Sequence, residues 1–541
     1  MGPRAWMIAF AFGLAACTAA PPAPVANEAT GARPNIVFVL LDDLRFDAMG
    51  FLTPGLETPN IDFLARNGVY FPNAVVTTSL CSPSRATLLT GMSTVNHGVV
   101  DNNNASEDGL VFFPKYLQAA GYQTGFFGKW HMGAATDAPR PGFDKWVSFR
   151  GQGTYYPADG IPPARAAAGE VNTLNVDGVS TPRRGYITDE LTDYAMDWLT
   201  SGRDPEKPFF LYLSHKAVHS DFMPAERHRT QYADLRIDLP ASSADTEENY
   251  RGKPMWVRNQ RNSWHGVDFP YHTDRDLKEY LREYYRTLSS VDESLGRILA
   301  WLREAGLEQN TVVVFSSDNG FLFGDHGLID KRNAYEPSVR VPLLVYAPGR
   351  VPAGVTNATR VRNLDFAPTV LDFAGVPSPP QFEGRSYRNL AEGRVTPEQW
   401  DAPDFIYSYY WEWTFPHTPT TFAIASGTTK YIQYHGVWDT EELYDLANDP
   451  GEMNNLIDDP AWREKKVELR NRLYAGLQRG DGSHVVPYTE RNAEGIVWRN
   501  AEEDGAVAAP FPDRWVKPPN RADRYIGLIP ETPPPAAKPA D

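Results

Sequence analysis

The side chains that most clearly suggest chemistry in this 541-residue chain begin at Cys81. Residues 81 to 91 read Cys-Ser-Pro-Ser-Arg-Ala-Thr-Leu-Leu-Thr-Gly. Pro83 near the start and the residues after it predict a loop that enters a helix, with Cys81 at the positive end of the helix dipole. An anion could bind there. A lone cysteine is more often a small buried hydrophobic side chain, so the whole run, and not the cysteine alone, indicates a modified nucleophile.

Oxygen ligands follow two predicted strands. They are Asp42 and Asp43, directly after the run 35–41, and Asp318 and Asn319, after the run 311–317. The carboxyl ends of strands in an α/β sheet line the ligand crevice, so the two pairs can converge there. Three carboxylates and an amide suit Ca²⁺ or Mg²⁺ better than zinc. Either pair alone would more often only open a solvated turn, because Asp and Asn favour turns.

The elements that must position these residues are strands alternating with helices. The continuous apolar runs 35–41 and 311–315 predict buried parallel strands, because neither alternates as a half-exposed strand does. Residues 208–213 and 340–346 predict two more strands. Between residues 285 and 304, apolar side chains recur every three or four positions, which predicts a helix. This alternation indicates an α/β layered fold.

The pattern changes after about residue 395. Short aromatic-rich runs at 405–411 and 430–434 are followed by a helix with Leu469, Leu473 and Leu477 on one face. These runs predict a small antiparallel sheet with one helix. The stretch 483–541 is rich in Pro, Asp and Glu and predicts an extended or partly disordered tail.

The first residues predict export. Arg4 precedes an apolar stretch too short to span a bilayer, which is typical of a signal peptide over residues 1–17. Cys17 ends Leu-Ala-Ala-Cys and looks like a bacterial lipoprotein cleavage and acylation site. The Ala- and Pro-rich residues 18–33 predict a flexible tether. We therefore expect a membrane-anchored lipoprotein in the periplasm, at the outer membrane or at the cell surface.

The net charge narrows the class of partner. A charge of −16 argues against nucleic-acid binding, which needs a basic surface to release counterions. An anionic substrate would have to be attracted by a locally basic pocket.

The run that begins at Cys81 resembles the signature of the formylglycine-dependent sulfatases of the alkaline-phosphatase superfamily. The resemblance extends over residues 34 to 480. It includes Asp42-Asp43, Gly128-Lys129-Trp130-His131, His219, Ser317-Asp318-Asn319-Gly320, Lys331, Glu442-Leu443-Tyr444-Asp445-Leu446 and Asp449-Pro450-Gly451-Glu452. One departure is that Ser220-Asp221 follows His219, where the family often has a proline two residues after the histidine.

The resemblance implies an alkaline-phosphatase-like sandwich, in which a large mixed, mostly parallel sheet lies between helices. We expect a catalytic domain over 34–395 and a C-terminal subdomain with the smaller sheet over 396–482. It also implies that a formylglycine-generating enzyme oxidises Cys81 to formylglycine, whose hydrate has two hydroxyls. One would attack sulfur, and loss of a proton from the other would release sulfate.

The resemblance also implies a role for each polar residue. Asp42, Asp43, Asp318 and Asn319 would hold Ca²⁺, with Mg²⁺ as the alternative, together with residue 81. Arg85 and Lys129 would orient the diol, and Lys331 would neutralise the sulfate oxygens. His131 would be the base for sulfate release and His219 the proton donor to the departing alcohol.

Two further segments are candidates for substrate binding. Gly324-Asp325-His326-Gly327 either reaches the substrate through His326 or is a polar turn. In residues 256–265, Trp256, Arg258, Arg261 and Trp264 could stack on sugar and pair with sulfate, or could clamp the protein's own surface.

Taken together, the sequence predicts a lipoprotein sulfatase that acts on sulfated carbohydrate, with 6-sulfated N-acetylglucosamine as the suggested substrate. Segments such as Gly185-Tyr186-Ile187-Thr188-Asp189 resemble bacterial N-acetylglucosamine-6-sulfatases. One alternative is a phosphonate or phosphate ester hydrolase of the same superfamily. The other is a sulfoglycan-binding lipoprotein whose cysteine is never oxidised, although binding alone would not need Lys129, His131, His219 and Lys331.

Overall fold

The structure is a computed structural model that describes residues 33–477, apart from 107–108, 134–135, 264, 269, 271–275, 413–414 and 436–438. The predicted signal peptide with Cys17, nearly all of the predicted tether and the predicted tail lie outside the described residues. Within the described part of the chain, no helix is both long enough and apolar enough to cross a membrane.

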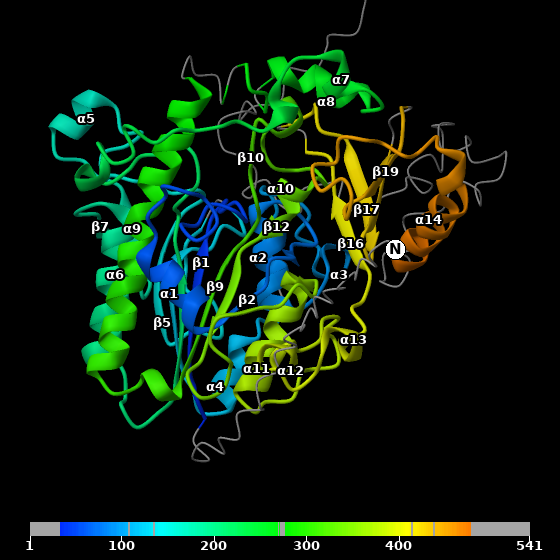
Figure 1. The fold of residues 1–541 in the computed structure, drawn as a ribbon. Coiled ribbons are helices and arrows are strands. Elements are labelled where there is room, and N and C mark those ends of the chain that lie inside the picture. The colour runs from blue at the N-terminus through cyan, green and yellow to red at the C-terminus, as the bar shows by residue number, and fades with distance from the viewer. Residues whose placement is uncertain are drawn as a thin grey trace, which may run out of the picture.

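A ten-stranded sheet forms the centre of the described residues (Figure 1). From edge to edge its strands are β14 (Val355–Thr356), β2 (Val69–Tyr70), β13 (Leu343–Tyr346), β9 (Thr311–Ser317), β1 (Asn35–Leu41), β8 (Phe209–Ser214), β4 (Gln123–Lys129), β5 (Lys145–Phe149), β6 (Thr173–Val176) and β7 (Val179–Pro182). The strands from β9 to β5 run parallel, whereas β13, β6 and β7 join through antiparallel pairs. The predicted mixed, mostly parallel sheet is therefore confirmed.

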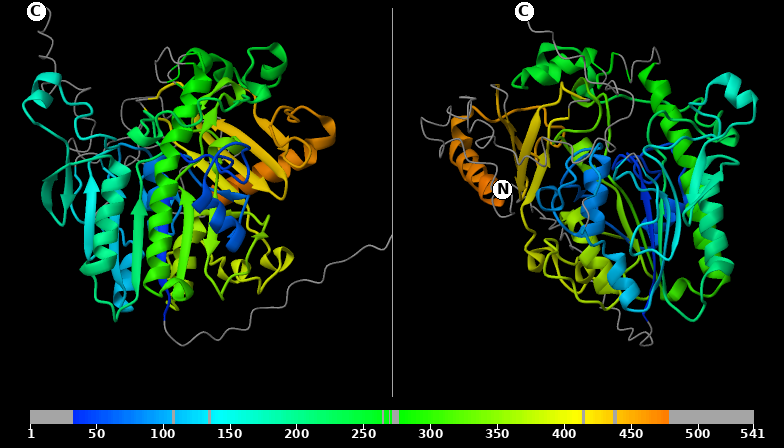
Figure 2. Two further views of the ribbon diagram at one scale, coloured as in Figure 1. Left: turned by 60° about the vertical axis from the view of Figure 1, so that its left-hand side comes forward. Right: turned by 180° about the vertical axis from the view of Figure 1, so that it is seen from behind.

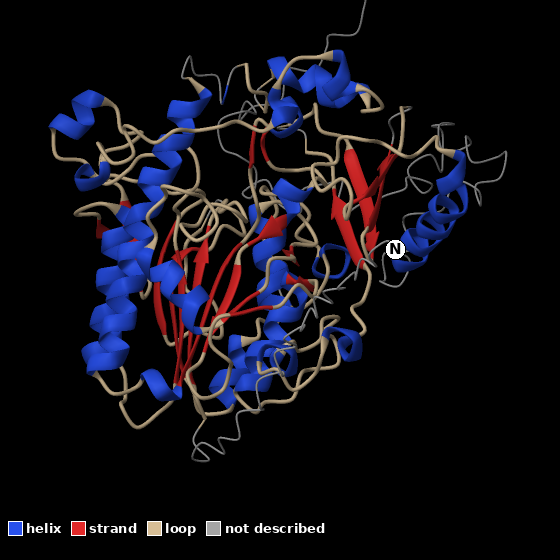
Figure 3. Ribbon diagram, in the orientation of Figure 1, coloured by secondary structure: helices blue, strands red, loops and turns tan. Residues whose placement is uncertain are grey.

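Helices cover both faces of this sheet (Figures 2 and 3). Successive residues of β1 point alternately into the two cores between the sheet and these helices. Val37 and Val39 face a core that includes α1 (Pro59–Asn67), α6 (Ile187–Asp197) and α9 (Leu277–Glu304). Ile36 and Phe38 face the other core, with α2 (Cys81–Thr90), α4 (Pro114–Ala119), α11 (Phe366–Phe373) and α12 (Arg388–Ala391). A strand buried on both faces needs the continuous apolar run seen in the sequence.

Shorter elements connect these layers. The helices are α3 (Thr94–His97), α5 (Pro163–Ala167), α7 (Glu247–Tyr250), α8 (Met255–Asn259), α10 (Glu336–Val339) and α13 (Pro397–Trp400). The strands are β10 (Leu322–Phe323) with β11 (Ile329–Asp330), and β12 (Arg340–Val341) with β3 (Ala74–Val75) and β15 (Val361–Arg362).

The single strand expected over residues 340–346 is wrong. Pro342 divides it, so that β12 pairs with β3 while β13 pairs with β9 in the central sheet. A proline lacks the N–H that a continuous strand would need at that position.

The small antiparallel sheet with one helix is confirmed. It contains β16 (Phe405–Tyr409), β17 (Thr420–Ser426), β18 (Thr429–His435) and β19 (Glu442–Asp445). Helix α14 (Arg463–Leu477) packs on one face through Leu469, Leu473 and Leu477, as its spacing predicted. The other face packs against Tyr335 and its neighbours from the larger part of the molecule. The domain boundaries given above stay predictions.

Candidate active site

The acidic residues after β1 and β9 meet at one edge of the central sheet. The two strands are parallel neighbours in which Leu41 is paired with Ser317. The segments that follow them therefore leave the sheet side by side. The Asp43 N–H donates to Oδ1 of Asp318 at 3.2 Å. One carboxylate oxygen from each of Asp42, Asp43 and Asp318 lies within 4.8 Å of the others. The predicted convergence of the two strand ends is therefore present.

Cys81 lies at the same edge, on the first residue of α2. Leu80 before it is extended, with φ −160° and ψ 137°, so the helix begins at the cysteine as the Pro83 pattern predicted. The Sγ of Cys81 lies within 4.8 Å of ligand atoms on Asp42 and His219. Burial, and then the charge of Asp42, raise the pKa of the thiol to about 12. An unmodified Cys81 is therefore protonated at neutral pH and a poor nucleophile.

Arg85 connects this helix to the acidic cluster. It lies one turn after Cys81 on the same helix face. Its Nε donates to Oδ2 of Asp318 at 2.8 Å, and its Nη1 donates to the Lys129 carbonyl and to Oγ of Ser214, each at 2.7 Å. The guanidinium is fully buried, so these bonds fix its orientation.

Lys129 reaches the cluster from the end of β4. Its Nζ donates to Oδ2 of Asp42 and to Oε1 of Gln152. Gly128 makes this placement possible, because it has φ +127° and a Cβ there would lie 1.7 Å from the Ser214 carbonyl oxygen. Burial raises the pKa of Asp42, but the charges of Lys129 and its other cationic neighbours hold the pKa well below its usual range.

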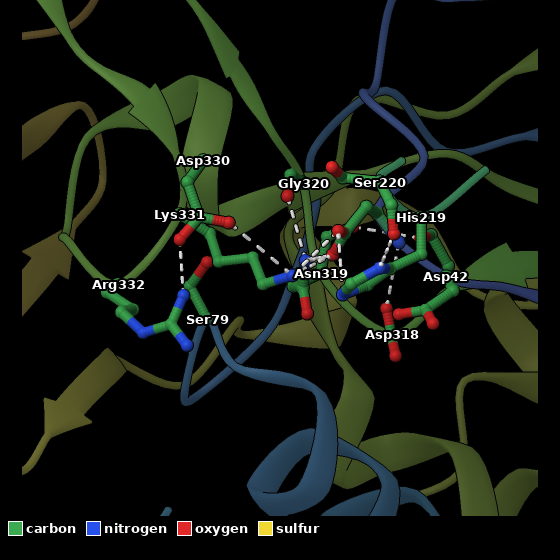
Figure 4. A network of polar contacts seen from close by, with 12 residues as sticks. Asp42, Ser79, His219, Ser220, Asp318, Asn319, Gly320, Asp330, Lys331 and Arg332 are labelled. Carbon is green, nitrogen blue, oxygen red and sulfur yellow. Dashed lines mark hydrogen bonds and ion pairs between the residues drawn. The ribbon is translucent and has the colours of Figure 1, made fainter. Parts of the chain in front are cut away.

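Lys331 provides a third buried cation and points toward Asn319 (Figure 4). Its Nζ donates to Oδ2 of Asp43 at 2.6 Å. Burial disfavours the charged ammonium, but Asp43 and other anionic neighbours raise the pKa of Lys331 well above its ordinary value. Lys331 therefore stays charged inside the protein.

Both predicted histidines lie in the cluster. Nδ1 of His131 lies 3.3 Å from Oγ of Ser82, the residue after Cys81. Nε2 of His219 lies 3.7 Å from Oδ2 of Asp43, while its Nδ1 lies 2.6 Å from the Ser220 carbonyl. Burial lowers the pKa of both rings well below the ordinary value. For His219 to donate a proton, the negative charge of a bound substrate must raise that pKa again.

The carboxylates and the amide fit a hard divalent cation. Oδ1 of Asp42 and Oδ1 of Asn319 are buried and accept no hydrogen bond from the described residues. Burial, and then the charge of Asp42, raise the pKa of Asp318 to about 7, which indicates how costly three buried carboxylates are together. A cation among them would satisfy the free oxygens and offset the repulsion.

The described residues of segment 256–265 that were predicted to bind substrate contact other parts of the protein. Trp256 is buried with its ring 5.5 Å from that of Tyr434. Arg258 pairs with Glu247 at 2.7 Å, and Arg261 pairs with Asp268 at 3.1 Å. These are contacts with the protein's own surface, which is the second interpretation given above. Trp264 lies outside the described residues.

His326 is likewise enclosed by protein. It is buried, and its ring lies 4.3 Å from that of Tyr335. Burial lowers its pKa well below the ordinary value. Its role toward substrate stays a prediction.

Sequence reasoning missed three residues of the site. Ser214 ends β8, so the strand-end rule could have found it. Gln152 lies in a loop and carries no such signal. Lys216 follows β8, and its Nζ lies 4.7 Å above the ring of Tyr155. Burial, and then the charge of Lys129, lower the pKa of Lys216 to about 8.

Two protein-family models match this chain. Residues 34–376 match the family model "Sulfatase", and residues 324–479 match "N-sulphoglucosamine sulphohydrolase, C-terminal". The N-acetylglucosamine-6-O-sulfatase of Bacteroides thetaiotaomicron is 33% identical over 82% of this chain and 86% of its own length.

Two solved structures extend the comparison. A protein in complex with its substrate D-glucosamine-2-N,6-O-disulfate has a TM-score of 0.73 at 31% identity, over 83% of this chain and 98% of that one. A phosphonate monoester hydrolase of Agrobacterium radiobacter has a TM-score of 0.65 at 21% identity, over 82% and 95%. The second likeness concerns the fold alone.

Proposed function

Because this chain belongs to the sulfatase family, whose members hydrolyse sulfate esters, we propose that it removes 6-O-sulfate from N-acetylglucosamine residues of sulfated carbohydrate. The observation that carries the proposal is the surroundings of Cys81. Three buried cations, Arg85, Lys129 and Lys331, gather at the helix start in a protein of net charge −16. A sulfate group is therefore attracted locally, although the whole surface repels anions.

Two groups would supply chemistry that ordinary side chains lack. Formylglycine, made from Cys81 by a formylglycine-generating enzyme, supplies a hydrated aldehyde that can attack sulfur and afterwards release sulfate. Ca²⁺, or Mg²⁺, held by Asp42, Asp43, Asp318, Asn319 and residue 81, supplies Lewis-acid activation. The orphaned oxygens of Asp42 and Asn319 support this ligand set.

The remaining residues bind charge and transfer protons. Lys331 neutralises the sulfate oxygens as negative charge shifts during bond cleavage, while Arg85 and Lys129 orient residue 81. Their burial strengthens this effect, because no water screens the interaction. His219 donates a proton to the departing sugar oxygen, and His131 accepts the proton that is lost when sulfate is released.

A substrate panel tests the specificity. We expect catalytic efficiency to be highest on 6-sulfated N-acetylglucosamine, lower on other sulfated sugars and on an aryl sulfate, and lowest on a phosphonate monoester. The likeness to the Bacteroides N-acetylglucosamine-6-O-sulfatase supports this order. Some phosphatase activity is also expected, because the same cations attract both anions. A clear preference for the phosphonate would support the alternative hydrolase, whereas preference for another sulfated sugar would remove only the sugar assignment.

The variant His219→Ala tests the proposed proton donor by comparing a sugar sulfate with an aryl sulfate. A sugar alkoxide is a poor leaving group and needs a proton, so its sulfate should lose about 10²-fold or more in kcat. An aryl sulfate has a much better leaving group and should lose far less. Equal losses on both substrates would contradict the proposed role of His219.

We also propose that the chain is exported and anchored through a lipid on Cys17, as its first residues predict. Lipid attachment needs the Cys17 thiol. In native cells, a Cys17→Ser variant should therefore be absent from the membrane fraction, whereas the unaltered protein should be recovered in it. Recovery of both proteins in the same fraction would contradict the anchor.

A further inference from the structure

The segment that carries Lys331 ends against the C-terminal sheet. Three consecutive residues beyond the lysine each bond to that part of the chain. The Ala334 carbonyl accepts from Nζ of Lys430 at 2.7 Å, the Tyr335 hydroxyl donates to Oε2 of Glu442 at 2.9 Å, and the Glu336 N–H donates to Oε2 of Glu452 at 2.7 Å. All three partners are fully buried. Glu442 and Glu452 belong to the two C-terminal sequence motifs noted above, which contribute no residue to the catalytic cluster.

Glu442 is the centre of these contacts. Its carboxylate accepts from the hydroxyls of Tyr335, Tyr434 and Tyr444, and Nζ of Lys253 lies 3.3 Å away. Charge-assisted bonds of this kind are strong and directional when water is excluded. The carboxylate therefore fixes Tyr335 in one place relative to β18 and β19.

Lys331 itself has little regular structure to hold it. It follows the two-residue strand β11, and the residues on either side have positive φ values, 84° for Asp330 and 77° for Arg332. Non-glycine residues keep this conformation only where their surroundings impose it. Arg332 is held in part by Glu412, whose Oε1 accepts from its Nε at 2.9 Å. The residues that follow Lys331, Arg332 and 334–336, thus contact groups from the last third of the chain.

We infer that Glu442 is a positioning residue, which acts through Tyr335 to keep the Lys331 ammonium beside Asp43 and the bound sulfate. This inference rests on the proposed role of Lys331 in catalysis. Glu442 does not touch the cluster, so its effect must pass along residues 331–335. The competing explanation is that Glu442 only stabilises the C-terminal sheet.

Two tyrosine variants separate these explanations. Tyr335→Phe and Tyr434→Phe each remove one hydroxyl from the same carboxylate, but only Tyr335 belongs to the Lys331 segment. We expect Tyr335→Phe to lower kcat about tenfold with KM changed less than about twofold, because small misplacements of a catalytic group are costly. Tyr434→Phe should lower the melting temperature without changing kcat. An equal loss of kcat in both variants would overturn the inference.

A double-mutant cycle with Lys331→Ala identifies the route of the effect. If Tyr335 acts through Lys331, adding Tyr335→Phe to Lys331→Ala should change kcat by less than about twofold. A further tenfold loss would show that Tyr335 acts elsewhere and would refute the inference.

Trace acetylation followed by peptide mass spectrometry separates this inference from the proposed function. Lys331 is buried and ion-paired, so it should react slowly in the unaltered protein and faster in Tyr335→Phe, with exposed Lys207 as the internal standard. Unchanged labelling would contradict the positioning role. If labelling rises but Lys331→Ala keeps full activity, positioning stands and the catalytic role of Lys331 falls.

Discussion

Cys81→Ala is expected to abolish sulfate ester hydrolysis, with a loss in kcat of about 10⁴-fold or more, because removal of a covalent nucleophile leaves only binding and charge stabilisation. The fold should survive. The side chain is one small buried group on the first residue of α2, and alanine is compatible with that position. Circular dichroism and the melting temperature should therefore change little while turnover disappears. An active Cys81→Ala enzyme would refute the mechanism.

Peptide mass analysis of protein from the native host provides the complementary measurement. Burial and the charge of Asp42 raise the pKa of the thiol to about 12, so an unmodified cysteine would be inactive at neutral pH. We expect active protein to carry an aldehyde at residue 81. An unmodified thiol in essentially all molecules of an active preparation would contradict formylglycine, and in an inactive preparation it would favour the binding-protein alternative.

The position of the proposed metal ligands could be predicted because they follow the strongest signal in the sequence. A strand buried on both faces needs a continuous apolar run, and the residue after such a run lies at the sheet edge. Asp42 and Asp318 obey this rule, and the structure places them together. The rule does not say that β1 and β9 are neighbours. That pairing depends on how the intervening strands are ordered in the sheet, which local pattern does not encode.

The long helix α9 was predicted only in part. It begins at Leu277, eight residues before the predicted start, where Asp276 accepts from two backbone N–H groups. The aliphatic repeat misses this first part because its buried residues include Tyr280 and Tyr284. Tyr284 matters for the site, since its hydroxyl donates to the Asp43 carbonyl at 2.8 Å. Aromatic residues at helical spacing therefore carried a signal that the aliphatic pattern did not use.

The segment 256–265 shows why residue type alone is a weak guide to substrate binding. Basic side chains that alternate with aromatic ones can bind a sulfated sugar, but they can equally well pack against other parts of the protein. Trp256 is buried against β18 and Arg258 pairs with Glu247, so both find partners within the protein. The position of Lys331 was also beyond local pattern, because it lies in irregular backbone between Asp330 and Arg332, both of which have positive φ.

Asp318→Asn is expected to disable catalysis and to remove the stabilisation that calcium provides. Asp318 is both a proposed ligand and the partner of Arg85, so the change weakens the metal site and leaves a buried guanidinium with less compensating charge. The raised pKa of Asp318 shows that its negative charge is itself costly without metal, so the main loss in melting temperature should appear when Ca²⁺ is present. The loss of activity should be at least about 10²-fold, given the combined damage to ligand and orientation.

Asp292→Asn is the matched control for that variant. Asp292 is also a buried carboxylate, and burial raises its pKa to about 6, but it accepts from the N–H groups of Asn60 and Ile61 in another part of the fold. This variant should lose stability while it keeps its response to metal and its kcat.

The dependence of the melting temperature on Ca²⁺ concentration tests whether Asp318 belongs to a metal site. A ligand that binds only the folded state stabilises it in proportion to the logarithm of its concentration, so the melting temperature of the unaltered protein and of Asp292→Asn should rise with added Ca²⁺. Asp318→Asn should show little or no rise, because it lacks one of the three carboxylates that make the site attractive to a hard cation. Chelation should abolish activity in the unaltered protein, and Ca²⁺ or Mg²⁺ should restore it. Full activity after thorough chelation, or stoichiometric zinc with neither calcium nor magnesium, would remove the proposed metal from the mechanism.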